Sequence, residues 1–201
     1  MDTLFWVVLG FLAGSIPFSV WLGRLLLRAD IRRYGDGNPG AANAWRAGGW
    51  PVGLLAVLLD YLKGAIPVGF AHFSLGMHGP ALAAMALAPV MGHAFSPFLR
   101  FRGGKAVAVT FGIWTGLTLG EVPILLGVLL GVFFFMLAAD SWSVMLGMAG
   151  VLVHLLLRGH APILLAVWAG NTLILAWKHR ASLRLPFRFR PWLQRMVGGP
   201  Q

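Results

Sequence analysis

The chain opens with a long apolar run, TLFWVVLGFLAGSIPFSVWLGRLL at residues 3–26, in which Arg24 is the only charged side chain. A helix needs about 20 mostly apolar residues to cross the hydrocarbon core of a bilayer. No basic segment precedes this run, and no small-residue cleavage site follows it. We therefore expect a first transmembrane helix at 3–26 and not a signal peptide that is removed.

The composition of the whole chain agrees with a membrane protein. Of its 201 residues, 58% are hydrophobic and 11% are charged, whereas soluble domains carry about 25% charged residues. The predicted fold is all-α, a polytopic integral membrane helical bundle with about seven transmembrane helices, forming a single domain over residues 1–201. Hydropathy and the positions of proline and glycine place the further spans near 52–72, 80–98, 106–119, 122–139, 143–157 and 161–177.

Basic residues indicate the direction of the chain in the membrane. With the N-terminus outside, fourteen of the sixteen Lys and Arg residues fall in the inner segments 24–50 and 99–105 and in the tail from residue 178. Cytoplasmic segments of membrane proteins carry this excess. We expect the N-terminus outside and the C-terminus in the cytoplasm. The net charge of +10 then indicates contact with anionic membrane lipids and not with nucleic acid.

Two polar, glycine-rich loops separate the first spans. The first is GDGNPGAANAWR at 35–46, and the second is FRGGK at 101–105, directly before the fourth predicted helix. Glycines let backbone N–H groups turn toward an anion, while Arg46 and Lys105 supply the fixed positive charge that a phosphate needs. The G-x-x-x-x-G-K-S/T spacing of nucleotide triphosphatases is absent. The two loops predict a site for a phosphorylated substrate at the cytoplasmic face.

Other polar residues receive structural interpretations. Asp60 and Lys63 are three residues apart and share one helix face, so we expect a structural pair that supports the first loop; direct contact of Lys63 with substrate is the alternative. No pattern of histidines and carboxylates predicts a metal site, and the chain has no cysteine. The segment 186–193, PFRFRPWL, is expected to lie at the lipid headgroups. Four histidines are expected to be structural: His72, His78, His154 and His160.

Several ordered motifs resemble the bacterial acyl-phosphate-dependent glycerol-3-phosphate acyltransferase family. They cover nearly the whole chain and are most specific over residues 14–112. The motifs are Gly14-Ser15-Ile16-Pro17, the loop at 35–46, Asp60-Tyr61-Leu62-Lys63-Gly64, Gly92-His93-Ala94-Phe95-Ser96-Pro97-Phe98-Leu99 and Phe101-Arg102-Gly103-Gly104-Lys105.

The resemblance implies a reaction and a set of site residues. Family members transfer a fatty acyl group from acyl phosphate to the 1-hydroxyl of glycerol 3-phosphate, without cofactor or metal, at the cytoplasmic face of the bacterial inner membrane. It implies Arg46, Lys105 and His179 as catalytic residues, and leaves the oligomeric state open, with a monomer plausible. The implied substrate-binding residues are Gly35, Asp36, Gly37, Asn38, Gly40, Asn43, His93, Arg102, Gly103, Gly104, Ser143 and Ser182.

The chain also departs from the family pattern. Asp36 stands where the family usually has Ser, Ala106 where it has Gly, and Ser182 where it has Asn. The third motif is reduced to Asp140-Ser141-Trp142-Ser143-Val144, in which the usual arginine is lost. Two alternatives therefore stay open: a protein of the same fold that binds or acts on another phosphorylated head group, and a small membrane anion transporter.

Overall fold

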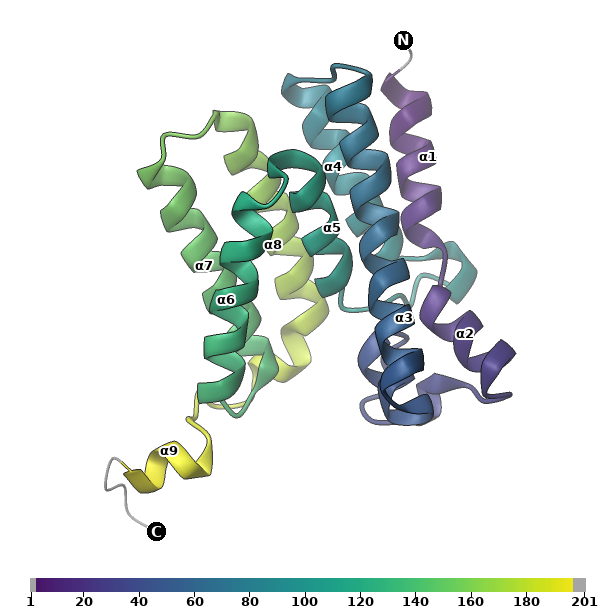
Figure 1. The fold of residues 1–201 in the computed structure, drawn as a ribbon, viewed down its shortest axis with the longest axis vertical. Helices are drawn as coiled ribbons and strands as arrows, with labels where there is room; N and C mark the ends of the chain where they lie inside the picture. The colour runs from purple at the N-terminus through teal and green to yellow at the C-terminus, as the bar shows by residue number, and fades with distance from the viewer. Residues whose placement is uncertain (1–2, 197–201) are drawn as a thin grey trace. The chain divides into compact units, whose positions relative to one another are not determined.

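The computed structural model describes residues 3–196, which fold almost entirely into helices (Figure 1). This confirms the all-α prediction for the described residues. The chain forms two compact units, Met1–Leu119 (unit 1) and Gly120–Gln201 (unit 2).

Unit 1 is built on two closely packed helix pairs, α1 with α4 and α3 with α5. Its α-helices are α1 (Thr3–Ser15), α2 (Phe18–Leu26), α3 (Ala41–Gly69), α4 (Gly79–Ala94) and α5 (Val107–Thr118). Three short helical turns join them: η1 (Ile31–Arg33), the π-helical η2 (Phe70–Ser74) and η3 (Pro97–Leu99).

Glycine makes the close approach of both helix pairs possible. A Cβ atom at Gly14 of α1 would overlap the backbone of Pro89 in α4, and a Cβ atom at Gly112 of α5 would overlap the carbonyl of Tyr61 in α3. Small residues at helix contacts let backbones approach in membranes, where association relies on packing and not on hydrophobic burial. Glycine thereby lets α1 contact α4, and α3 contact α5, at backbone distance.

The first predicted span is interrupted at Ile16 and Pro17, so that α2 leaves α1 at an angle (Figure 1). Proline has no N–H to donate, and its ring collides with the carbonyl of the fourth residue before it. The break frees the Ile16 carbonyl from the helix and leaves it to accept another donor.

The second predicted span begins earlier than expected. Residues 41–46, interpreted above as part of a loop, form the first turns of α3, which starts directly after Gly40. Gly49 adopts a left-handed backbone (φ 72°) that kinks the helix, and Pro51 follows within the helix. The polar loop is therefore limited to residues 35–40, and Asn43 and Arg46 are carried on a helix.

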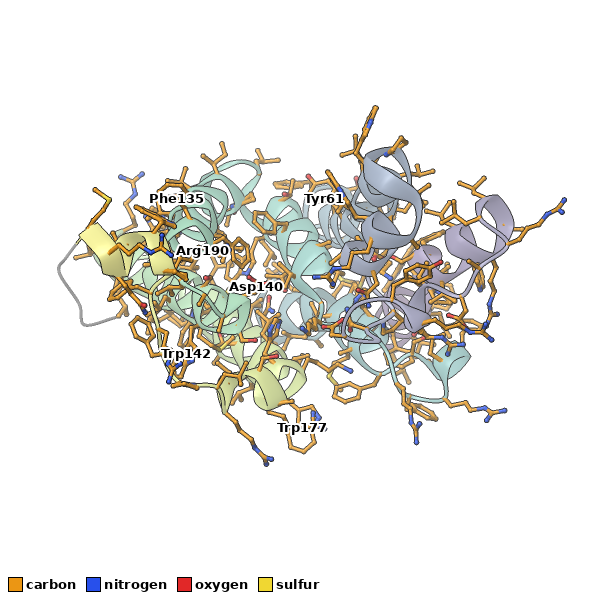
Figure 2. All side chains as sticks on the ribbon, turned by 90° about the horizontal axis from the view of Figure 1, so that it is seen from below. Tyr61, Phe135, Asp140, Trp142, Trp177 and Arg190 are labelled. Atoms are coloured by element: carbon orange, nitrogen blue, oxygen red, sulfur yellow. The ribbon has the colours of Figure 1, made fainter. Side chains whose placement is uncertain are left out.

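Unit 2 contains α6 (Glu121–Met136), α7 (Asp140–Leu157), α8 (Pro162–Leu183) and α9 (Pro191–Met196), with α7 packed against both α6 and α8. The segment after α8 folds back on the connection between α6 and α7. An antiparallel bridge joins Leu137 and Phe189, and Arg190 Nε donates to the Phe134 carbonyl at 2.9 Å. Figure 2 shows Arg190 and Phe135 beside α9.

Four helical stretches of the described residues are long and apolar enough to cross a membrane: Thr3–Leu26, Ala41–Ser74, Gly79–Leu99 and Asp140–Leu157. The apolar helices α5 and α6 are shorter, at 12 and 16 residues, and α8 carries Lys178 and Arg180 in its last turns. Long apolar helices agree with an integral membrane protein. The count of seven spans and the direction of the termini stay predictions.

Candidate functional site

The first polar loop folds around the carboxylate of Asp36. Asp36 Oδ2 accepts a hydrogen bond from Lys105 Nζ at 2.7 Å, which joins the two polar loops. Asp36 Oδ1 accepts from Asn43 Nδ2 at 3.0 Å and from the backbone N–H of Asn38 at 3.1 Å. Arg46 Nη1 in turn donates to Asn43 Oδ1 at 2.8 Å. The structure thus brings both predicted cations of unit 1, Arg46 and Lys105, into one hydrogen-bonded network.

Glycine is required at two positions of this loop. Gly35 has a φ of 55°, and a Cβ atom there would overlap Asn43 Oδ1 and the side chain of Arg46. Gly37 has a φ of 73°, in the region that favours glycine. Gly40 does not have the unusual backbone conformation expected of these loop glycines. Its φ is −120°, an extended conformation that any residue can adopt. Its place is the residue before α3, where a Cβ atom would lie 2.6 Å from Asn38 Nδ2.

The pair of Asp36 and Lys105 is partly open to solvent, with side chains that are 45% and 30% exposed. Partial burial by itself would raise the pKa of Asp36, but the hydrogen bonds from Lys105, Asn38 and Asn43 outweigh it, and the pKa lies below its ordinary value. The carboxylate is therefore ionised at neutral pH. On acidification, its ion pair with Lys105 is lost when the pH falls through this lowered pKa.

The second polar loop packs tightly over His93, at the end of α4. A Cβ atom at Gly104 would overlap the His93 ring, and one at Gly103 would overlap the His93 carbonyl. The Gly104 N–H donates to that carbonyl at 3.0 Å. This N–H was expected to help to bind phosphate, and here it is already used within the protein. Two residues later, Ala106 caps α5 in a left-handed conformation (φ 64°).

A buried ion pair lies between α2, α3 and α4. Lys63 Nζ is 2.7 Å from Asp60 Oδ1, and the two side chains are 3% and 2% exposed. Lys63 also donates to the Ile16 carbonyl at 2.8 Å, and Ser19 Oγ donates to Asp60 Oδ2 at 3.0 Å. His93 Nδ1 lies 3.8 Å from Asp60 Oδ1. The predicted pair of Asp60 and Lys63 is confirmed, and it uses the carbonyl that the break at Pro17 releases.

A small cavity connects this pair with the polar loops. Its volume is about 10 Å³, and its lining includes Pro39, Asp60, Lys63, His93 and Gly104. That volume is close to the minimum that holds one water molecule. The polar lining therefore suits a single bridging water beneath the loops.

A larger groove of about 850 Å³ opens beside the first loop of unit 1, and its lining is strongly basic. Asp30 pairs with Arg32 at 2.6 Å, and the hydrogen bonds from Arg32 hold the pKa of Asp30 well below its ordinary range. One carboxylate cannot neutralise five guanidinium groups, so the groove keeps a positive charge. Arg102, expected to bind substrate, lies in this groove and not in the network around Asp36. The arginines of the lining are Arg24, Arg32, Arg33, Arg100 and Arg102.

Three predicted site residues, Ser143, His179 and Ser182, belong to unit 2. His179 is 3% exposed, and its Nδ1 lies 3.0 Å from Ser141 Oγ. The Ser143 hydroxyl is buried and has no hydrogen-bond partner among residues 3–196. Ser182 lies in the last turns of α8. The contact of Ser141 with His179 arises from the packing of α7 on α8, which no sequence motif indicated. A joint role of these residues with Arg46 and Lys105 stays a prediction.

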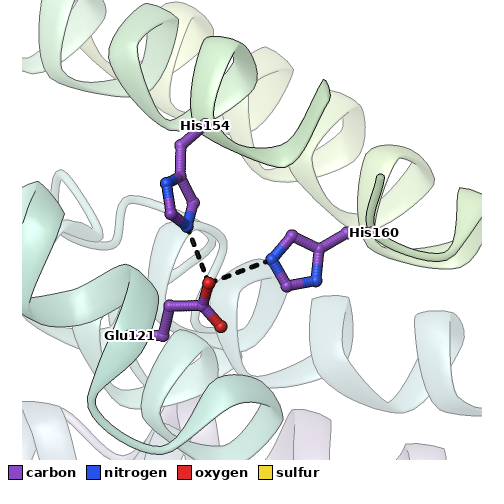
Figure 3. A group of neighbouring side chains, drawn as sticks. All are labelled: Glu121, His154 and His160. Carbon is purple, nitrogen blue, oxygen red and sulfur yellow. Dashed lines mark hydrogen bonds and ion pairs between the residues drawn. The ribbon is translucent and has the colours of Figure 1, made fainter. Parts of the chain in front are cut away.

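A further cluster in unit 2 was missed by sequence reasoning. Glu121 Oε1 lies 2.9 Å from His154 Nε2 and 3.2 Å from His160 Nε2 (Figure 3). Both histidines were expected to be structural residues without partners. The spacing of His154 and His160 across a helix end is no recognised pattern, and Glu121 joins them only through the packing of α6 on α7.

The long apolar helices place this protein in the class of integral membrane proteins, and its two basic loops, joined around a glycine turn, have the chemistry to bind an anion. A comparison with known sequences identifies the family. A sequence model of the glycerol-3-phosphate acyltransferase family matches residues 4–186. The chain belongs to this family.

Relatives and solved structures agree over almost the whole chain. Glycerol-3-phosphate acyltransferase 1 of Thermotoga maritima is 37% identical over 198 residues, which is 92% of this chain and 97% of that protein. The Staphylococcus carnosus glycerol-3-phosphate acyltransferase is 33% identical over 188 residues, 88% of this chain and 90% of that protein.

Crystal structures of PlsY, an integral membrane glycerol 3-phosphate acyltransferase, superpose in its glycerol 3-phosphate form (TM-score 0.84, 28% identity) and its lysophosphatidic acid form (TM-score 0.82, 27% identity). Each match covers 100% of this chain and 95% of the other.

Proposed function

We propose that this protein transfers a fatty acyl group from acyl phosphate to the 1-hydroxyl of glycerol 3-phosphate, giving lysophosphatidic acid and inorganic phosphate. Its family and the two ligand forms of PlsY support the acceptor and the product. The observation that carries the proposal is the network of Asp36, Asn43, Arg46 and Lys105, which holds two cations at a glycine turn.

Arg46 and Lys105 are the residues that would bind substrate phosphate. A phosphate group carries more negative charge than the Asp36 carboxylate, so it can displace Asp36 from Lys105. The pair is partly exposed, and such pairs contribute only about 0–1 kcal/mol. The cost of this exchange is therefore small, and Asp36 holds the lysine in place until the substrate arrives.

The reaction needs positioning more than chemical activation. Acyl phosphate is a mixed anhydride, so the glycerol hydroxyl can attack the acyl carbon while the bond from that carbon to the phosphate oxygen breaks. Phosphate leaves with the electron pair, and the hydroxyl proton passes to a phosphate oxygen or to a histidine. The cations neutralise the leaving phosphate and the developing oxyanion. No step of this proposed route requires a metal or a cofactor.

The proposal also gives roles to three residues of unit 2. His179 is the proposed third catalytic residue, held by Ser141, and the buried hydroxyl of Ser143 is a donor available to a substrate oxygen. Ser182 is the proposed substitute for the amide that the family usually carries there.

The proposed setting is the bacterial inner membrane, with seven spans, the N-terminus outside and the site facing the cytoplasm. Support comes from the basic residues, which gather in the loops around Arg46 and Lys105 and in the tail. Cysteine-accessibility labelling tests this, since the native chain has no cysteine. A cysteine near Gly37 that reacts with an impermeant reagent added from outside would overturn the orientation.

The reaction is tested with purified protein in detergent or lipid, given palmitoyl phosphate and glycerol 3-phosphate without metal or nucleotide. We expect phosphate release that depends on glycerol 3-phosphate, with lysophosphatidic acid formed in equal amount. Glycerol is the matched control acceptor, because it has the hydroxyl and lacks the phosphate. No turnover from folded protein across several acyl-chain lengths would overturn the proposal.

Asp36 favours one second candidate, an acyltransferase for a different phosphorylated acceptor. The carboxylate occupies Lys105 at 2.7 Å, at a position where the family usually has Ser, so the phosphate pocket of this chain differs from the family pattern and could favour another head group. Release of phosphate with another phosphorylated alcohol, and not with glycerol 3-phosphate, would favour this candidate.

A further inference from the structure

Glu121, His154 and His160 come from three different helical elements and meet at one end of unit 2. Glu121 is the first residue of α6, His154 lies in the last turn of α7, and His160 lies two residues before α8. The two imidazole Nε2 atoms and Glu121 Oε1 point toward one another (Figure 3). The three ligand atoms all lie within 4.8 Å of one another.

We infer that these residues form a binding site for a divalent transition metal of the zinc class. Two imidazole nitrogens and one carboxylate oxygen are a set of ligands that zinc accepts, with water in the fourth position. Magnesium and calcium prefer oxygen ligands throughout. The ligand set therefore selects for zinc and its neighbours in the transition series.

The distances already approach those of a coordinated ion. A tetrahedral ion with bonds of about 2.0–2.1 Å holds its ligand atoms about 3.3 Å apart. The separations from Glu121 Oε1 to His154 Nε2 and to His160 Nε2 are 2.9 Å and 3.2 Å. Small side-chain movements would admit the ion. The metal would take the place of the protons that the two Nε2 atoms share with the carboxylate.

Exposure allows an ion to reach the site. The side chains of Glu121, His154 and His160 are 34%, 24% and 21% exposed. Arg158 is the one competing cation among the described neighbours, with Nε 3.6 Å from Glu121 Oε1 and a side chain that is 68% exposed. Its long side chain can turn away into solvent, although its charge opposes a bound cation.

A bound metal would join the start of α6, the end of α7 and the start of α8. The site would thus fix one end of unit 2, and it shares no residue with the network around Asp36. Under the topology proposed above, this end lies outside the cytoplasm, where metal would be drawn from the external medium.

The test measures zinc binding to the purified full chain after removal of any histidine tag and treatment with a chelator. We expect the wild type to bind one equivalent of Zn²⁺. In His154→Ala and in His160→Ala this binding should be lost, or the affinity for Zn²⁺ should fall at least about tenfold. Glu121→Gln is a milder variant, because its amide oxygen still accepts hydrogen bonds but is a poor metal ligand. The matched control is His78→Ala, since the His78 side chain is exposed and, among the described residues, bonds only to the Gly76 carbonyl of its own turn.

Two further readouts separate metal binding from a merely structural role. Arg158→Gln should tighten zinc binding by several-fold because it removes the competing charge. Co²⁺ should give the visible absorption of a tetrahedral site in wild type and not in Glu121→Gln. Equal zinc stoichiometry and affinity in wild type, Glu121→Gln and His154→Ala would overturn the inference, as would a Co²⁺ spectrum that these substitutions leave unchanged.

Discussion

Unit 1 holds two pairs of lysine and aspartate with the same contact distance and different surroundings. Lys63 and Asp60 are 2.7 Å apart with side chains 3% and 2% exposed, and Lys105 and Asp36 are 2.7 Å apart with side chains 30% and 45% exposed. Ser19 and the Ile16 carbonyl add hydrogen bonds to the buried pair. Distance alone therefore does not assign a role. Burial makes the first pair a fixed structural contact, and exposure makes the second exchangeable for a substrate anion.

The largest expected effect is on stability, when the buried pair loses one partner. Lys63→Met leaves the charge of Asp60 uncompensated in the interior and should lower the free energy of unfolding by about 3–5 kcal/mol. Thermal or denaturant unfolding in detergent measures it. The double variant Asp60→Asn with Lys63→Met removes both charges and should recover part of the loss. If Lys63→Met has the same free energy of unfolding as the wild type, the buried pair is not a structural contact and does not differ in role from the exposed pair.

The exposed pair should show the opposite result, a loss of activity with little change in stability. Lys105→Ala and Arg46→Ala should each lower kcat/KM by about 100-fold or more, as expected when a group that stabilises transition-state charge is removed. The unfolding midpoint should change little, because exposed pairs contribute about 0–1 kcal/mol. Arg195→Ala, in α9, controls for general loss of positive charge. Near-normal turnover in either site variant would contradict the site assignment.

Removing the other member of the exposed pair sharpens the comparison. Asp36→Ser frees Lys105 for phosphate and restores the hydroxyl usual in the family, so we expect turnover to be kept or raised and KM to fall a few-fold. Steady-state kinetics at neutral pH, where Asp36 is ionised, provide the measurement. If the substitution abolishes turnover, Asp36 takes part in the reaction and is more than an exchangeable partner.

The smallest expected effect concerns the residue next to Lys105. Ala106 has a left-handed backbone, with a φ of 64°, which costs a residue with a Cβ atom about 1–2 kcal/mol. Part of the gain from Ala106→Gly is lost through the greater freedom of glycine in the unfolded chain. We expect a stabilisation of about 0.5–1 kcal/mol, seen as a higher unfolding midpoint with unchanged kinetics. A lower midpoint would show that the buried methyl group matters more than the strain.

Local sequence predicted what depends on local spacing. Asp60 and Lys63 share a helix face because they are three residues apart, and their pair is confirmed. Glycines 35, 37 and 40 were expected to allow backbone conformations closed to other residues; Gly35 and Gly37 have positive φ, whereas Gly40 is extended. The family motifs also single out Asp36, which stands where the family usually has Ser and which pairs with Lys105.

Two helix boundaries and one side-chain cluster were not predicted from the sequence. The first polar segment was expected to be a loop through Arg46, yet α3 begins at Ala41 because the turn ends at Gly40. Hydropathy treated residues 3–26 as continuous, although Pro17 breaks the helix. The meeting of Glu121 with His154 and His160 depends on the packing of α6 on α7 and on the turn before α8, for which neither periodicity nor motif gives a signal.

The position of Asp60 and Lys63 on one helix has a consequence for how the chain enters the membrane. Each charge alone would cost about 2.5–3.5 kcal/mol at the centre of an inserting helix. Because α3 contains both, the lysine and its counter-ion are delivered together and can neutralise each other within the nascent segment. The part of α3 that carries Asp60 and Lys63 can therefore enter the membrane with its two charges already paired, before a partner helix packs against it.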